Sequence, residues 1–84
     1  MFYLYILKSK KDNSLYIGST NNLRRRLFEH NKGISKYTKS HLPYELKYYE
    51  SYQNEGDARQ REVSLKKDGR ALYILKKRIT KSLQ

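Results

Sequence analysis

The stretch FYLYILKSKKDNSLYIGS, residues 2–19, predicts a β-hairpin. Residues 2–9 and 14–19 are rich in aromatic and branched side chains, which favour extended strands. Between these two runs, Asp12 and Asn13 supply side chains that are common in tight turns. The chain is therefore expected to open with two antiparallel strands.

Alternation along the two strands assigns their side chains to opposite faces of the hairpin. If the turn contains an even number of residues, Tyr5 and Tyr16 share one face. The other face then carries the aliphatic residues Leu4, Ile6, Leu15 and Ile17. Two tyrosines are thus predicted to lie together on the face away from these aliphatic side chains.

A helix is predicted directly after the hairpin. Asn21 or Asn22 can cap its start, and the helix is expected to run to Lys32. Gly33 supplies a C-terminal stop, and Ile34 follows it as the expected apolar contact of such an end.

One side of this helix combines apolar and ionisable residues. Leu23 and Leu27, four residues apart, predict a buried stripe to which Phe28 adds. Arg26 and His30 have the same spacing, so we expect them to lie together beside that stripe.

The rest of the chain predicts a basic loop at residues 33–43, a third strand at 44–52 and helices at 54–67 and 68–80. The element order is then ββαβαα, with no repeat and no linker. We predict an α+β fold, in which about three helices flank a three-stranded antiparallel sheet.

Length and composition limit what this chain can be. Its 84 residues predict one small domain, residues 1–84, with a thin hydrophobic core, which leaves a homodimer or a partner protein open. The absence of cysteine excludes disulfides and thiolate metal sites, and fits a cytoplasmic protein. The apolar run at residues 1–7 is too short for a membrane span or a signal core.

The charge of the chain indicates its partner. Nineteen Lys and Arg residues against eight Asp and Glu residues give a formal net charge of +11. Such an excess favours a polyanion, most often nucleic acid. A membrane surface is a weaker alternative, because no stretch predicts an extended amphipathic helix with an exposed apolar face.

Glu62 has two interpretations. Ala58, Glu62 and Leu65 have the spacing of a single helix face, which would bring a carboxylate toward the core. Alternatively the stripe is Ala58, Val63 and Leu65, and Glu62 lies at its margin and pairs with Lys66. Spacing alone favours the second interpretation.

Taken singly, each of these residues has an ordinary structural explanation; taken together, they resemble the GIY-YIG nuclease domain. Residues 3–5, YLY, match the first triplet of that family, and residues 16–18, YIG, match its second triplet in full. Arg26, His30 and Glu62 match the arginine, histidine and metal-binding glutamate of the family. The chain is similar to a small stand-alone bacterial member, and to the N-terminal nuclease domain found in bacterial excision repair.

The resemblance implies a metal-dependent DNA endonuclease that acts in DNA repair, recombination or the processing of structured DNA. One Mg²⁺ or Mn²⁺ ion would be held by Glu62, and Arg26 would bind the phosphate. Tyr5, Tyr16 and His30 remain alternative bases, and we expect nearby positive charge to lower the tyrosine pKa values. No asparagine follows Asn54, whereas many members use one to hold the phosphate. This departure supports the alternative of a non-catalytic DNA- or RNA-binding module.

A further set of residues is expected to contact the nucleic acid around this centre. It consists of Gly18, Arg24, Arg25, Lys36, Tyr37, Lys39, Lys67 and Arg70. Lys67 or Arg70 is the candidate for the task of the missing asparagine. Arg25 can pair with Glu29, and Tyr37 either stacks on a base or packs beneath its loop, of which packing is the preferred interpretation.

Overall fold

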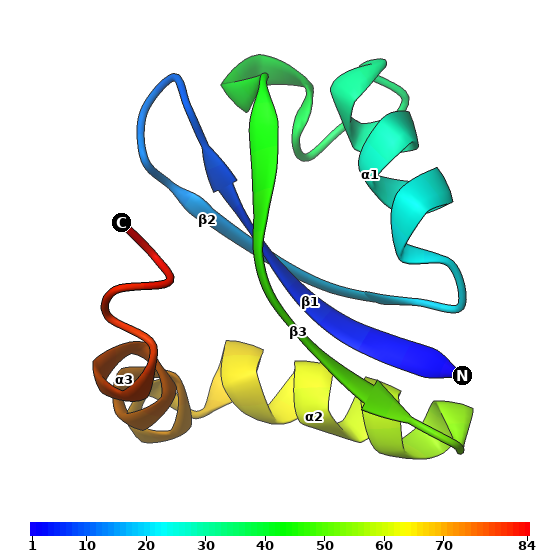
Figure 1. Ribbon diagram of the computed structural model, residues 1–84, viewed down its shortest axis with the longest axis vertical. Helices are drawn as coiled ribbons and strands as arrows, with labels where there is room; N and C mark the ends of the chain where they lie inside the picture. The colour runs from blue at the N-terminus through cyan, green and yellow to red at the C-terminus, as the bar shows by residue number, and fades with distance from the viewer.

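A computed structural model describes residues 1–84 and arranges them in three layers (Figure 1). Helix α1 (Leu23–Asn31) covers one side of the sheet, and helices α2 (Glu55–Lys67) and α3 (Gly69–Arg78) cover the other. The order ββαβαα and the α+β class confirm the prediction. None of the helices has the length and apolar character needed to cross a membrane.

The sheet contains strands β1 (Phe2–Ser9), β2 (Leu15–Thr20) and β3 (Tyr44–Tyr52). Both neighbours pair with β1 in antiparallel fashion, so the order across the sheet is β2-β1-β3. The first strand is therefore the central one, and β2 and β3 each have a free edge.

The register of the hairpin confirms the predicted faces. Leu7 pairs with Tyr16 and Tyr5 pairs with Gly18, so the two tyrosines share a face and are diagonal neighbours. Asn13 adopts a φ of 65°, a left-handed conformation that asparagine tolerates better than most residues, and this closes the turn.

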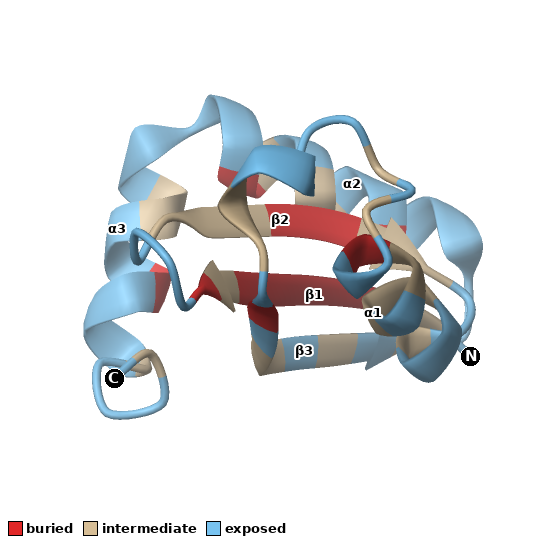
Figure 2. Cartoon of the chain, turned by 90° about the horizontal axis from the view of Figure 1, so that it is seen from above, coloured by how far each residue is buried: buried red, intermediate tan, exposed pale blue.

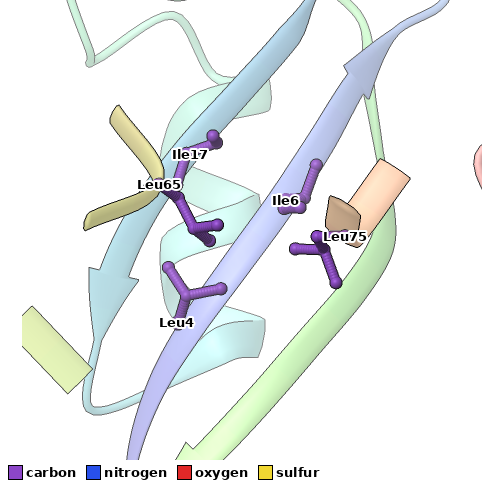
Figure 3. Packing of buried hydrophobic residues seen from close by; sticks show 5 residues of the cluster. All are labelled: Leu4, Ile6, Ile17, Leu65 and Leu75. Carbon is purple, nitrogen blue, oxygen red and sulfur yellow. The ribbon is translucent and has the colours of Figure 1, made fainter. Parts of the chain in front are cut away.

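The central strand is buried on both faces (Figure 2). Toward α2 and α3 it presents Leu4 and Ile6, which form a cluster with Ile17, Leu65 and Leu75 (Figure 3). Ile17 comes from β2, Leu65 from α2 and Leu75 from α3, so this cluster joins three elements to the central strand.

The opposite face of the sheet forms a second cluster against α1. Tyr5, Leu7 and Tyr44 are its buried members, and Leu23 and Leu27 of α1 pack against them as predicted. The prediction for Phe28 was wrong, because this side chain is 59% exposed. Its position one residue after Leu27 turns it about 100° away around the helix, where the Lys32 ammonium lies over its ring.

The ends of α1 follow the predicted capping signals. The Asn22 side chain accepts a hydrogen bond from the Arg25 amide at 3.0 Å. At the other end Gly33 has a φ of 77°, and its N–H donates to the His30 carbonyl. Ile34 is 66% exposed, so the expected apolar contact does not bury it.

A carboxylate network attaches α2 to β3. The Arg61 guanidinium donates to both carboxylate oxygens of Glu50 at 3.0 and 3.2 Å, and the hydroxyls of Tyr48 and Tyr52 donate to the same group at 2.6 and 2.5 Å. Burial acts to raise the pKa of Glu50, but the Arg61 charge and these hydrogen bonds outweigh it and hold the pKa below its usual value.

We predict that Glu50→Gln lowers the free energy of unfolding by about 1–3 kcal/mol at pH 7. The amide oxygen cannot accept all of these hydrogen bonds, and its NH₂ group faces donors. The pKa of Glu50 is lower in the folded protein than in the unfolded chain. Ionised Glu50 therefore contributes to the free energy of unfolding above the ordinary carboxyl pKa of 4.5, and this contribution is lost as the pH falls. Urea unfolding at pH 7 and pH 3 measures this: the difference between variant and wild type should shrink in acid.

Glu45→Gln is the matched control, since Glu45 lies on the same strand with an exposed side chain. An equal effect of both substitutions at pH 7 would contradict a special role of the Glu50 network.

Candidate active site

The hairpin and α1 bring three of the predicted residues together. The Tyr5 hydroxyl lies 2.9 Å from Nε2 of His30, which is fully buried at the end of α1. The Tyr16 ring centroid lies 4.8 Å from that of His30 and 6.3 Å from that of Tyr5. These side chains form one aromatic cluster beneath α1.

Gly18 leaves the space that Tyr5 occupies. A Cβ atom at this position would lie 2.5 Å from the Tyr5 hydroxyl oxygen and 2.7 Å from Cζ of the same ring. Neither distance is compatible with packing, so the strand requires glycine opposite Tyr5. Gly18, which was expected to contact the nucleic acid, is buried, and the group that approaches it closely is Tyr5 of the same protein.

Thr38 is the site residue that the sequence analysis missed. Its Oγ1 lies 2.8 Å from Nδ1 of His30 and 3.5 Å from the Ser35 carbonyl, and Thr38 is fully buried. Because the carbonyl can only accept, Thr38 donates to Ser35 and accepts from Nδ1–H of His30. The hydrogen bonds thus assign a tautomer in which Nε2 accepts from Tyr5.

Burial holds this hydrogen-bonded chain neutral. Burial, assisted by the Arg26 charge, lowers the pKa of His30 to about 4. Burial also raises the pKa of Tyr5 to about 12, and the neighbouring Arg26 guanidinium opposes that shift only in part. The Arg26 charge does act to lower the Tyr5 pKa as expected, but the net shift is upward, because removal from water is the larger effect.

The Arg26 charge acts on Tyr5 and His30 of this cluster from α1. Its side chain is 30% exposed and forms an ion pair of 3.2 Å with Glu29, one turn later. The predicted pairing of Arg25 with Glu29 was wrong. Arg25 is exposed and instead donates to the Asn21 side chain at 2.8 Å.

Glu62 approaches from α2, on the other side of the sheet. One of its carboxylate oxygens accepts from the Ser19 hydroxyl of β2 at 2.7 Å, and the other accepts from Nζ of Lys66 at 2.7 Å. Its charge also acts to raise the pKa of Tyr5. Val63 is 43% exposed, so the stripe that included it was wrong, although the pairing with Lys66 is present.

The donor set at Glu62 limits the kind of metal ion it can hold. No group of three or more His, Asp or Glu side chains converges in the protein. A single carboxylate fits a Mg²⁺ ion that keeps most of its water ligands, and it does not fit an ion that requires several protein ligands.

A polar cavity of about 400 Å³ adjoins Arg26. Ser19 and Thr20 of β2, Arg25 of α1 and Arg59 of α2 contribute to its lining. Three arginines line this cavity and can donate to phosphate oxygens, and the carboxylates Glu29 and Glu55, which also line it, pair with Arg26 and Arg59.

The remaining predicted contact residues lie at the surface. Arg24, Lys36, Lys39, Lys67 and Arg70 are all exposed. Tyr37 is 83% exposed, so the interpretation that it packs beneath its loop was wrong. The side chains of Lys67 and Arg70 lie at the corner between α2 and α3 and make no hydrogen bond within the protein.

The chain is similar to known proteins in sequence and in fold. Residues 1–79 match the sequence family described as the GIY-YIG catalytic domain. The UPF0213 protein of Clostridium perfringens is 48% identical over 68 residues, covering 80% of this chain and 72% of that protein. The UPF0213 protein of Bacillus pumilus is 42% identical over 83 residues, covering 94% of this chain and 84% of that protein.

A solved structure is also similar. The solution NMR structure of the UPF0213 protein from Bacillus halodurans is 32% identical, with a TM-score of 0.52, and the match covers 90% of this chain and 86% of that chain. The names of these relatives state no activity.

We predict that Gly18→Ala lowers the free energy of unfolding by about 1–3 kcal/mol, because the new methyl group forces the buried Tyr5 ring to move. The same movement lengthens the hydrogen bond to His30, which the chemical shifts of the His30 ring nitrogens report. Gly69→Ala is the control: a Cβ there meets nothing within 4 Å, and alanine at this helix position should leave the protein equally or more stable.

We predict that His30 stays neutral down to about pH 4, with its proton on Nδ1. In the unfolded chain the imidazole binds its second proton near pH 6.5. The contribution of neutral His30 to stability is therefore complete above pH 6.5 and is lost as the pH falls toward 4. Nitrogen NMR of the imidazole ring measures both its tautomer and its pKa. Thr38→Val should shift the tautomer ratio, whereas Thr38→Ser should preserve it; identical spectra for both would contradict the role of Thr38.

Proposed function

The chain belongs to the GIY-YIG catalytic domain family, and from this premise we propose that it is a metal-dependent endonuclease that hydrolyses phosphodiester bonds in DNA. One observation carries the proposal: Arg26, Glu62 and the Tyr5–His30 pair lie around β1 and β2, and the charges of Arg26 and Glu62 both act on Tyr5. Phosphodiester hydrolysis needs these groups, to bind the phosphate, to hold a cation and to move a proton.

Arg26 binds the scissile phosphate in this proposal. Its planar guanidinium can donate to two non-bridging oxygens at once, a geometry that lysine cannot copy. Glu29 holds the side chain in place from one turn later, and the partial exposure of Arg26 leaves it accessible to a substrate. The cavity beside it, with Arg25 and Arg59, receives a neighbouring phosphate of the same strand.

Glu62 would hold the divalent ion that nucleases of this family generally use. When bound, such an ion polarises the phosphoryl group and stabilises the leaving oxygen. Ser19 orients the carboxylate through its hydrogen bond, so that Glu62 is fixed relative to β2. Lys66 balances the charge of Glu62 in the free protein and has to yield when a cation binds.

Tyr5 and His30 move the proton of the attacking water. The Tyr5 hydroxyl already donates to Nε2 of His30, so its oxygen accepts the water proton while its own proton passes to His30. The Arg26 charge is one cause of the low His30 pKa, and a bound phosphate neutralises that charge, which makes His30 a stronger base when substrate is present. Tyr16 packs against His30 and restricts the orientation of the ring.

The charge of the protein supports DNA as the polyanion. With a net charge of +11 and exposed basic residues on α1, the following loop and α3, binding is mainly to phosphates. Such contacts position a substrate without reading its sequence. We therefore expect selection by DNA structure, which suits repair, recombination or the processing of structured DNA.

One observation favours a second function, a DNA- or RNA-binding module without catalysis. No asparagine follows Asn54, and Lys67 and Arg70, the candidates for its task, are exposed surface residues. Such a module needs neither Glu62 nor a metal ion, which separates the two functions by experiment.

We predict cleavage of flapped, branched or single-stranded DNA in Mg²⁺ or Mn²⁺, and none in EDTA. Glu62→Gln removes the charge that holds the cation, and Arg26→Lys keeps the charge but loses the planar donors. Each should reduce the cleavage rate by about 100-fold or more. Gel assays on end-labelled substrates, with binding measured in parallel, give both quantities.

Asp57→Asn serves as the matched control, because it removes one exposed carboxylate from the same helix. Cleavage that continues in EDTA would exclude the metal-dependent mechanism. Wild-type protein that binds DNA but cuts none of these substrates would favour the binding module.

A further inference from the structure

We propose that an apolar groove beside Tyr16 binds an unpaired nucleobase of the DNA strand, next to the phosphate that is cut. This inference rests on the proposed function, because it assigns a base-binding subsite to the same centre. Of the residues that line the groove, only Tyr16 and Lys66 also contact the candidate active site.

The groove lies between β2, α2 and α3 and has a volume of about 510 Å³. Residues 15–17 form one wall, Leu65 and Leu72 form the other, and Tyr37 and Lys66 stand at the rim. Six of its seven lining residues are hydrophobic, so the groove offers flat and aliphatic surface rather than hydrogen-bonding groups. A cavity of this size is in the range that holds small organic ligands.

Tyr37 is an exposed residue in a loop that its neighbour anchors. Thr38 is fully buried against His30, and this anchors the loop between α1 and β3. Tyr37, the residue before it, is 83% exposed at the rim of the groove. An exposed ring at the rim of an apolar groove is a surface on which a base can stack.

Two residues connect the groove to the candidate active site. Tyr16 lines the groove and packs against His30, and Lys66 lines the groove and pairs with Glu62. The polar cavity near Arg26 begins at Ser19, three residues further along β2. A DNA strand that follows β2 would place a phosphate at the cavity and a base in the groove.

The surroundings of the groove favour a nucleotide over an apolar peptide. Lys36 and Lys39 are exposed in the loop that carries Tyr37, and Lys66 and Lys67 are exposed at the end of α2. No carboxylate lines the groove. Apolar walls with a basic rim complement a base with its attached phosphates, because stacking and charge attraction act on the two parts of one nucleotide.

This geometry predicts a preference for unpaired DNA. Bases in a duplex are stacked and paired, and bringing one into the groove requires that pairing to be broken. A base in a flap, gap or single strand enters without that cost. The groove therefore selects substrates with an unpaired nucleotide adjacent to the scissile phosphate.

The test measures binding in EDTA, so that no cleavage is required. The probes are a duplex with a single-stranded flap that carries 2-aminopurine at each position near the junction, and a fully paired duplex. For wild type we expect fluorescence quenching at one flap position. Tyr37→Ala should weaken flap binding about 10-fold, with less than a twofold change for the duplex, and Tyr37→Phe should retain flap binding.

Tyr73→Ala is the matched control, because Tyr73 is 60% exposed with a lysine over its ring but lies outside the groove. Equal losses for Tyr37→Ala and Tyr73→Ala, or equal losses on flap and duplex, would overturn the inference. Position-specific quenching without any cleavage in Mg²⁺ would retain the subsite and reject the nuclease. Cleavage in Mg²⁺ with no effect of Tyr37→Ala on flap binding would support the nuclease and reject the base-binding subsite.

Discussion

Burial of β1 on both of its faces is the constraint on which the rest of the structure depends. An 84-residue chain has little apolar material, and here one strand serves two clusters at once, with aliphatic residues toward α2 and α3 and Tyr5 and Leu7 toward α1. The same arrangement places a phenol in a dry position beside β2. The tyrosine of the candidate site is therefore also a core residue, which ties the site to the stability of the sheet.

That burial also determines the protonation states in the site. Tyr5 and His30 are both neutral at neutral pH, because each would lose more hydration as an ion than its surroundings restore. Arg26 stays charged and partly exposed at the edge of this dry region. A neutral tyrosine–histidine pair next to a partly exposed cation is compatible with the proposed reaction, in which an anionic phosphate arrives from solvent.

Much of the fold and part of the site could be predicted from the sequence. Strand alternation placed Tyr5 and Tyr16 on one face, and capping residues located both ends of α1, since these features depend on neighbours in the chain. Predictions that depended on orientation around a helix were less secure. Phe28 and Val63 are exposed although their spacing admitted burial, because a rotation of about 100° per residue separates inward from outward positions.

What the sequence determined by itself was the set of local patterns: the hairpin, the order of helices and strands, the basic charge, and the spacing of Tyr5, Tyr16, Arg26, His30 and Glu62. The tertiary structure decided which of these groups are ionised and which residues support them. Tyr5 and His30 are 25 residues apart, and Thr38 reaches His30 from a loop that has no periodicity. The loss of hydration that shifts a pKa depends on all the neighbours that surround the group in space. These pKa shifts therefore arise only when the chain has folded.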